Sequence, residues 1–402
     1  MRVAIIGGGA AGFFSALSVK EHHPNSKVTI FEKSNKLLSK VKVSGGGRCN
    51  VTNACFSPSQ LSKSYPRGGK HLKKAFSVFQ TKDTIEWFSR RGVELKAEED
   101  GRMFPTTDNS QTIIDCFLKE ASQKNIKILE QSPIRKIVPE KEGYTLHLEG
   151  TSEHFNKVII ATGGSPKMSG FYWLQQLGHS ISPPLPSLFT FNIPSDQVKI
   201  LMGLVVENAT VRIQGTKLSH SGPVLITHWG MSGPAILKLS AWGARELAEN
   251  NYNFNIQINW LSIKSDEDAN EIIDNELRHM RKKKIMNACP FKLPNRMWKF
   301  LLEKVGINPD SVWLELSKKN RNKLLNILLN DIYEVKGKTT FKEEFVTCGG
   351  IKLSDISFTS MESRVCKNLY FAGEVLDIDG ITGGFNFQGA WTTGYIAGKL
   401  QS

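Results

Sequence analysis

The stretch RVAIIGGGAAGFFSALSV, residues 2–19, decides the fold of the chain. Its first five residues are a short β-branched and apolar run, and glycines at 7, 9 and 12 precede an apolar-periodic segment that extends to Val19. This order indicates a buried strand, a tight turn and a helix. A second buried strand, Val28–Phe31, leads into Glu32, which lies 32 − 12 = 20 residues after Gly12. The segment therefore predicts a complete βαβ unit.

The glycine spacing and the carboxylate after the second strand together predict dinucleotide binding. Gly7 permits the tight turn, Gly9 lets the backbone approach a pyrophosphate, and Gly12 permits close contact between helix and strand. The helix N-terminus supplies free N–H donors for the phosphates. Glu32 is expected to accept hydrogen bonds from the adenosine ribose hydroxyls. Because a carboxylate there repels a 2′-phosphate, NADP is disfavoured at this site.

NAD and FAD share this fingerprint, and three further segments favour FAD. Residues 44–53, SGGGRCNVTN, form a polar, glycine-dense loop suited to an extended cofactor, and ATGG at 161–164 ends a strand with two glycines. LYFAGE at 369–374 ends another strand and is followed by Asp379 and by GGFNFQ at 383–388, where the last helix begins. A helix N-terminus beside an isoalloxazine ring stabilises the negative charge that develops on reduction. No second GxGxxG follows a central strand, so NAD(P)H as electron donor stays open without a binding motif of its own.

The composition is that of a globular protein with a large core. The chain has 402 residues, of which 40% are hydrophobic and 22% charged, and this excludes disorder, a collagen-like structure and a small disulfide scaffold. Residues 3–19 carry no charge but contain too many glycines for a signal peptide or a membrane span. For the same reason we expect no membrane partner. Six cysteines without CxxC or Cys/His metal spacing indicate a reduced, cytoplasmic setting with no metal site.

The pattern of the chain changes after the prolines at 183, 184 and 186. Short β segments typical of a barrel or a sandwich follow up to Trp260, and residues 262–331 are mostly helical in period and rich in lysine. Strand character then returns, and the C-terminal segment supplies the glycines described above. We therefore expect a dinucleotide-binding domain made from both ends of the chain, with a β module and a helical module inserted between them.

Five motifs resemble a known family over nearly the whole chain. They are GGGAAG at residues 7–12, SGGGRCNVTN at 44–53, GRMFP at 101–105, THWGMSGPAIL at 227–237 and FAGEVLDIDGITGGFNFQGAWTTG at 371–394. The sequence resembles the BaiN and aminoacetone-oxidase-like group of bacterial FAD-dependent flavoproteins.

The resemblance implies an α/β fold with a Rossmann-like FAD-binding domain of glutathione-reductase type and with inserted β-barrel and helical domains. The implied boundaries are 1–186 plus 348–402 for the FAD-binding domain, 187–261 plus 332–347 for the β-barrel domain and 262–331 for the helical domain.

The resemblance also implies which residues contact FAD. Glu374 stands where many related flavoproteins carry Asp, and members of the group act on different substrates, so the family determines the cofactor better than the reaction. The implied FAD contacts are Gly7, Gly9, Ala11, Gly12, Glu32, Ser44, Gly46, Arg48, Cys49, Asn50, Thr52, Ile134, Thr162, Gly163, Gly373, Glu374, Asp379, Gly384, Asn386, Phe387 and Gln388.

The sequence contains few candidate catalytic residues. His228, between a predicted strand and a predicted helix, could relay a proton at the flavin; a buried, hydrogen-bonded structural histidine is the alternative. Disulfide reductases of related fold need a CxxxxC or CxxC pair, whereas Cys49 and Cys55 are separated by five residues. We therefore interpret Cys49 as a small packed loop residue rather than as half of a redox pair.

The net charge of 52 − 38 = +14 leaves two classes of function in view. Residues 33–82 hold eleven basic residues and no acidic one, as a polyanion-binding surface would, but this span also borders the predicted pyrophosphate loop. A second basic cluster, Arg278 to Lys284, is interpreted as a solvated helix face that Asp274 and Glu276 help to balance.

Aromatic residues interleaved with a recognised RNA module are absent from the sequence. We therefore predict an FAD-dependent oxidoreductase acting on a small organic substrate, with hydride transfer to or from flavin N5 and no nucleic-acid partner. A flavoprotein that acts on or senses a polyanion such as RNA is the alternative.

Overall fold

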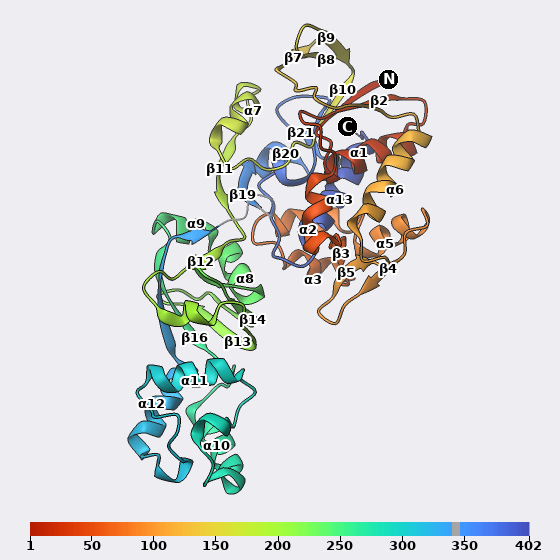
Figure 1. Ribbon diagram of the computed structural model, residues 1–402. Coiled ribbons are helices and arrows are strands. Elements are labelled where there is room, and N and C mark those ends of the chain that lie inside the picture. The colour runs from red at the N-terminus through yellow and green to blue at the C-terminus, as the bar shows by residue number, and fades with distance from the viewer. Residues whose placement is uncertain (340–345, 402) are drawn as a thin grey trace. The chain divides into compact units, whose positions relative to one another are not determined.

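The computed structural model describes residues 1–339 and 346–401, shown in Figure 1. The chain forms two compact units, unit 1 with Met1–Ser187 and Phe341–Ser402 and unit 2 with Leu188–Thr340. Unit 1 is thus built from both ends of the chain. The three-domain division stays a prediction, and each unit is described below by itself.

The helices of unit 1 are α1 (Ala10–His22), α2 (Ser39–Gly47), α3 (Pro58–Ser62), α4 (Gly69–Ala75), α5 (Thr81–Ser89), α6 (Ser110–Gln123), α7 (Tyr172–Gln176) and α13 (Phe385–Gly398). Its strands are β1 (Arg2–Ile6), β2 (Lys27–Phe31), β3 (Thr52–Asn53), β4 (Leu95–Ala97), β5 (Arg102–Pro105), β6 (Lys127–Leu129), β7 (Lys136–Glu140), β8 (Gly143–His147), β9 (Ser152–Phe155), β10 (Lys157–Ile160), β11 (Ile181–Pro186), β19 (Thr347–Ile351), β20 (Ile356–Ser357), β21 (Glu362–Ser363) and β22 (Leu369–Phe371).

The main sheet of unit 1 has the strand order β20-β21-β22-β10-β1-β2-β6 among the described residues. The strands from β22 to β6 run parallel, with Ile6 opposite both Phe31 and Ile160. This is the predicted βαβ unit, extended on both sides by strands from later in the chain. Because the carboxyl ends of parallel strands meet at one edge of a sheet, that edge is where a nucleotide is expected to bind.

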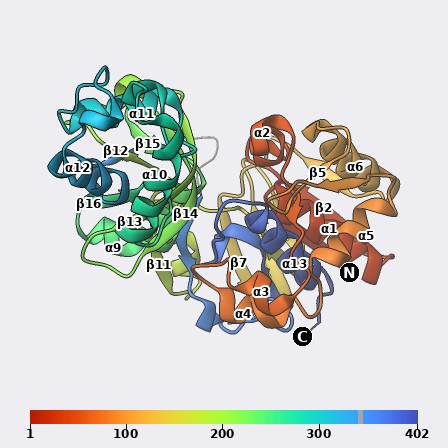
Figure 2. The ribbon, with the colours of Figure 1, turned by 90° about the horizontal axis from the view of Figure 1, so that it is seen from below.

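Helix α1 is buried along its length, from Ala11 to Val19. It packs against α13, and the two helices lie side by side in Figures 1 and 2. A Cβ atom at Gly394 would lie 2.9 Å from Ala11 O, and one at Gly398 would lie 2.6 Å from Ser15 O. Glycine at these two positions therefore lets the last helix approach the first one closely, which explains why the C-terminal segment belongs to the nucleotide-binding unit.

Three small antiparallel sheets complete the described part of unit 1. Strands β7, β8 and β9 form a meander, and β3, β5 and β4 form a second sheet that holds the GRMFP motif in β5. Asn109 caps α6, since its side chain accepts a hydrogen bond from Gln111 N–H at 2.9 Å. Strands β11 and β19 pair with each other and carry the chain towards unit 2 and back.

The helices of unit 2 are α8 (Pro234–Trp242), α9 (Ala244–Glu249), α10 (Asp266–Met280), α11 (Asn295–Lys304) and α12 (Lys318–Leu329). Its strands are β12 (Thr190–Asn192), β13 (Val205–Ile213), β14 (Ser219–Ile226), β15 (Gly230–Ser232), β16 (Asn253–Asn259), β17 (Asp331–Lys336) and β18 (Lys338–Thr339).

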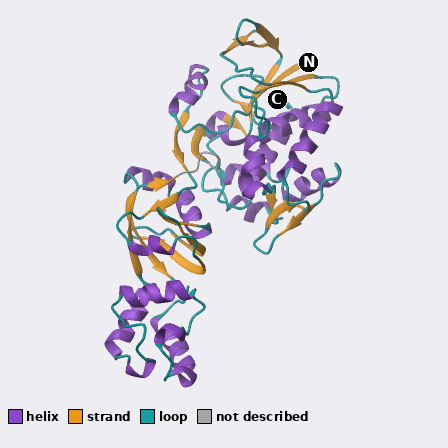
Figure 3. Cartoon of the chain, in the orientation of Figure 1, coloured by secondary structure: helices purple, strands orange, loops and turns teal. Residues whose placement is uncertain are grey.

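The strands of unit 2 form an antiparallel sheet in the order β17-β16-β13-β14-β15-β12-β18. The two edge strands, β17 and β18, follow one another in the chain with Gly337 between them, where φ is +86°. The sheet therefore curls until its edges meet in one continuous segment, as in a barrel. Helices α10, α11 and α12 lie at one end of unit 2 and the strands at the other (Figure 3).

Strands and helices of unit 2 share one apolar core, which includes Val211 and Ile258 from the sheet and Trp298 and Leu328 from the helices. Across residues 1–339 and 346–401, no helix combines the length and the apolar character that crossing a membrane requires.

Candidate functional site

The turn between β1 and α1 has the geometry expected for a pyrophosphate site. Gly7 has a φ of +115°, and a Cβ atom at Gly12 would lie 1.9 Å from Gly7 O, so the turn and the helix approach each other as closely as glycine permits. A Cβ atom at Gly9, in contrast, would meet no atom within 4 Å. Gly9 caps α1 without any side-chain hydrogen bond, and the first turn, which includes Ala11, holds no acidic residue. Free N–H donors and open space therefore coincide at Gly9.

Glu32 lies at the end of β2, and its carboxylate is held by backbone and side-chain donors. One oxygen accepts a hydrogen bond from Gly8 N–H at 2.9 Å, and the other accepts from Ser34 N–H at 2.9 Å and from Ser34 Oγ at 2.8 Å. These bonds fix the carboxylate beside the glycine turn. The half-buried side chain keeps lone pairs for a further donor such as a ribose hydroxyl.

The glycine-rich loop continues from α2, which is kinked at Ser44. Gly45, Gly46 and Gly47 all have positive φ, and Cβ atoms at Gly46 and Gly47 would meet no atom within 4 Å. This is a second stretch of backbone with open space in front of it. The Arg48 guanidinium lies over the Phe104 ring at 3.9 Å and pairs with Glu98 at 2.6 Å.

Cys49 and Asn50 are buried behind this loop. Burial raises the pKa of the Cys49 thiol to about 12, so the thiolate needed for disulfide exchange is suppressed. Asn50 joins the loop to α13, since its amide donates to Thr52 O at 3.0 Å and its carbonyl accepts from Gly384 N–H at 2.9 Å.

Several predicted contacts lie near the carboxyl ends of the parallel strands. Thr162 and Gly163 follow β10, and a Cβ atom at Gly163 would meet no atom within 4 Å. Gly373 follows β22 with a φ of +76°, and a Cβ atom there would lie 2.7 Å from that of Ala11, so Gly373 packs against the start of α1. Ile134 precedes β7 and is half-buried against the core of unit 1.

The Glu374 carboxylate is held from two sides. One oxygen accepts from Thr347 N–H at 2.7 Å and the other from Lys40 Nζ at 2.6 Å. A Cβ atom at Gly164 would lie 3.0 Å from the same carboxylate, which shows how closely the ATGG segment passes it. Sequence reasoning missed Lys40 and Thr347 as partners of Glu374, and no local pattern marks them, because they lie far from it in the chain.

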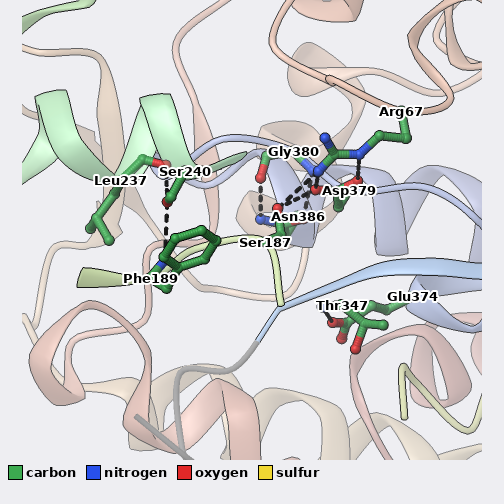
Figure 4. Close-up of polar contacts among 10 residues, drawn as sticks. All are labelled: Arg67, Ser187, Phe189, Leu237, Ser240, Thr347, Glu374, Asp379, Gly380 and Asn386. Atoms are coloured by element: carbon green, nitrogen blue, oxygen red, sulfur yellow. Dashed lines mark hydrogen bonds and ion pairs between the residues drawn. The ribbon is translucent and has the colours of Figure 1, made fainter. Parts of the chain in front are cut away.

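Asp379 is fully buried in a network that Figure 4 shows. Arg67 Nε donates to its carboxylate at 2.5 Å, and Arg67 Nη2 and Ser187 Oγ also donate to it. Burial raises the pKa of Asp379, and the Arg67 guanidinium opposes that shift. The Asp379 side chain thus serves to tie the loop before α13 to the loop before α4 and to the end of β11.

The start of α13 is fixed from inside the protein. Gly384 caps it with a φ of +90°, and a Cβ atom there would lie 2.3 Å from Thr52 O. Asn386 holds the preceding loop by two hydrogen bonds to Gly380, of 2.8 and 2.9 Å. The side-chain Oε1 of the buried Gln388 accepts a hydrogen bond from Thr52 Oγ1 at 2.6 Å, and the Phe387 ring stacks on that of Trp391. Asn386 and Gln388 therefore shape this end of the helix.

His228 belongs to unit 2, whereas all the predicted FAD contacts belong to unit 1. It lies in the turn from Thr227 to Gly230, between β14 and β15, with an exposed side chain. Its ring contacts that of Trp229, with ring centroids 3.5 Å apart. It is thus not the buried structural histidine that was the alternative interpretation.

The described residues of unit 1 fit FAD. Four glycines in the segments predicted to contact FAD present backbone without obstruction: Gly9, Gly46, Gly47 and Gly163. An uncapped helix N-terminus and a fixed carboxylate lie at the same turn. Pyrophosphate needs the first two features and an adenosine ribose needs the third.

The chain is similar to known proteins over almost its whole length. The family model described as HI0933-like protein Rossmann domain matches residues 1–400. The ribosomal RNA dihydrouridine synthase of Escherichia coli is 29% identical over 406 residues, which cover 98% of this chain and 96% of that protein. The 3-dehydro-bile acid delta(4,6)-reductase of Clostridium scindens is 25% identical over 415 residues, which cover 99% and 98%.

Solved structures agree on the fold. The 3-ketosteroid delta1-dehydrogenase from Sterolibacterium denitrificans has a TM-score of 0.53 at 9% identity, with 98% of each chain covered. At this identity the likeness supports the architecture alone. The chain belongs to the HI0933-like family and, as its motifs indicated, is an FAD-dependent oxidoreductase with a Rossmann fold.

Proposed function

We propose that the protein reduces a carbon–carbon double bond conjugated to a carbonyl group in a small organic substrate. One observation carries this proposal: two relatives aligned over almost the full chain have names that describe this kind of reaction. Dihydrouridine is uridine with a saturated ring bond next to a carbonyl, and a delta(4,6)-reductase of a 3-dehydro bile acid saturates bonds conjugated to a ketone. The substrates differ, but the bond that is reduced is of one kind.

Unit 1 would hold the cofactor along its glycine-rich edge. In this proposal Gly7, Gly9 and Gly12 admit the pyrophosphate to the N-terminus of α1, and Glu32 binds the adenosine ribose. The loop at 44–53 and the strand ends at 162–163 and 373–374 follow the rest of FAD. When bound there, FAD supplies hydride exchange at N5.

The reaction also needs charge stabilisation and a proton. The start of α13 has no side-chain cap and no acidic residue in its first turn, so its N–H groups are suited to negative charge that develops on a bound ring. We propose His228 as the proton carrier, because its side chain is exposed and an imidazole can both accept and donate a proton. In the net reaction a hydride adds to one carbon of the double bond and a proton to the other.

A uracil base in RNA is the second candidate substrate. It is favoured by the relatives named ribosomal RNA dihydrouridine synthase, from Escherichia coli and Haemophilus influenzae, each 29% identical to this chain. The reaction would be the same saturation of a bond next to a carbonyl. We further propose a cytoplasmic setting, which the six free cysteines support.

Reoxidation of the reduced enzyme tests the proposal. The FAD-loaded protein is reduced under anaerobic conditions, mixed separately with a 3-oxo-4,6-diene steroid, with 2-cyclohexenone and with unmodified ribosomal RNA, and followed by flavin absorbance. Return of the oxidised spectrum together with a saturated product supports the proposal, and the reactive substrate decides between the two candidates. The proposal is refuted if none of the three candidate substrates reoxidises the flavin or yields a saturated product, and only oxygen admitted afterwards restores the oxidised spectrum. NADH and NADPH are then compared as electron donors.

A further inference from the structure

One end of the helical part of unit 2 carries exposed positive charge without ion pairs. We call the following seven residues the cationic end. They lie in the last turn of α10, in the turn after it and in the first turns of α12, and none of them forms an ion pair with another described residue: Arg278, Arg281, Lys282, Lys283, Lys318, Lys319 and Lys323.

The two halves of the cationic end lie beside each other. Leu314 N–H donates to Arg281 O at 3.0 Å and Trp313 N–H donates to Lys283 O at 3.4 Å, so the turn after α10 runs alongside the segment that leads into α12. Arg321 of α12 in turn pairs with Asp274 of α10 at 2.7 Å. The charges therefore gather at one place rather than along separate helices.

Part of the acidic charge near this cluster is engaged in ion pairs with other residues. Asp274 is engaged by Arg321, whose hydrogen bond is the main cause of its lowered pKa, with a smaller contribution from Arg281. Glu276 forms no ion pair with any described residue, and Asp310 pairs with Lys284 at 2.9 Å. Glu315 adjoins Leu314 in the chain. Its single negative charge leaves a large excess of positive charge at the cationic end.

Helix stability does not explain the lysines of α12. Arg278 lies at the C-terminus of α10, where a cation is favourable, but Lys318 and Lys319 lie in the first turn of α12. A cation at that end opposes the helix dipole. Their charge adds to that of the dipole, and this combination attracts an extended anion.

An anionic membrane is a poor match for this surface. The apolar residues of α12, Leu324, Leu325 and Leu328, are buried in the core of unit 2, and Leu314 is the exposed apolar residue of the adjoining segment. Stable membrane adsorption needs a broad apolar face, which a single leucine does not provide. Spaced cations around a polar surface suit a phosphate backbone.

We propose that the cationic end binds the phosphate backbone of RNA. This inference rests on the second candidate of the proposed function and deepens it, because it assigns the surface that would hold an RNA substrate. It is tested by binding alone, so it can fail while the reduction of a small substrate stands, and the reverse also holds.

The experiment compares two double charge reversals in the FAD-loaded protein. Lys282→Glu with Lys283→Glu alters the cationic end, and Lys73→Glu with Lys74→Glu is the matched control, because these lysines are also exposed, adjacent and free of ion pairs with described residues. Binding of a fluorescent single-stranded RNA is measured by anisotropy at several salt concentrations. Circular dichroism and FAD content establish that both variants are folded.

We expect affinity for RNA to fall about tenfold or more in the first variant and the slope of log affinity against log salt to lose about 0.7 per contact, or about 1.4 in total. The control should keep both values near those of the unaltered protein. Equal losses in the two variants, or unchanged binding in the first, would each overturn the proposal.

Discussion

Two glycines of the same motif should fail in different ways when they are substituted. A Cβ atom at Gly12 would lie 1.9 Å from the backbone oxygen of Gly7, whereas one at Gly9 would meet no atom within 4 Å. Gly9 has a φ of −96°, which a larger residue adopts without strain. We therefore expect Gly9→Val to fold normally and to lose cofactor affinity, and Gly12→Ala to lose stability.

The magnitudes follow from these contacts. A valine at 9 fills the space in front of the helix N-terminus and removes at least one charge-assisted hydrogen bond to phosphate, worth about 1.5–3 kcal/mol. This corresponds to a Kd for FAD about 10- to 150-fold weaker. At Gly12 a methyl group meets backbone that cannot move aside, so overpacking should cost about 1–3 kcal/mol or more of the free energy of unfolding.

FAD titration by fluorescence quenching and urea denaturation of the cofactor-free protein measure the two effects separately. The reasoning is refuted if Gly9→Val binds FAD with unchanged affinity. It is equally refuted if Gly9→Val unfolds as readily as Gly12→Ala, because a side chain at position 9 would then disturb the fold instead of entering open space.

Three further outcomes are expected. Glu32→Ala should weaken FAD binding by about 1.5–3 kcal/mol, since it removes a charged acceptor that Gly8 and Ser34 hold in place; unchanged affinity in the same titration would show that the ribose lies elsewhere. Burial lowers the pKa of His179, so the unfolded chain binds the extra proton first as the pH falls below its ordinary value of about 6.5. Stability should therefore be retained above that pH and lost below it, and urea midpoints that are as acid-sensitive in His179→Gln as in the unaltered protein would contradict this. Cys49, with a pKa of about 12, should resist alkylation by iodoacetamide at neutral pH in the folded protein and react after denaturation, as peptide mass mapping can show; rapid labelling of the folded form would reopen the redox-pair interpretation.

Local patterns predicted the parts of the fold that depend on nearby residues. The run from Arg2 to Glu32 predicted β1, α1 and β2, because a buried strand, a glycine turn and an apolar helix each leave a short-range pattern. Helices α2 and α3 could not be predicted in this way, since kinked glycine-bearing helices and very short helices lack a clear period.

The rest of the site depends on contacts between distant segments. The ion pair of Arg67 with Asp379 joins residues 312 positions apart, and that of Lys40 with Glu374 joins residues 334 positions apart. No periodicity encodes such pairs, and each residue alone is compatible with a solvated loop. A barrel or a sandwich was expected in this part of the chain, but the point of closure at Gly337 could not be predicted, because it follows from strand pairing between β12 and β18.

Identification of the bound cofactor tests the central claim most directly. The protein is purified without added nucleotide, denatured by heat, and the released material is separated by chromatography with FAD, FMN and NAD as standards. We predict a yellow protein that releases FAD in an amount approaching one per chain and no NAD. A colourless protein that releases NAD, or that takes up no FAD when it is offered, would contradict the account.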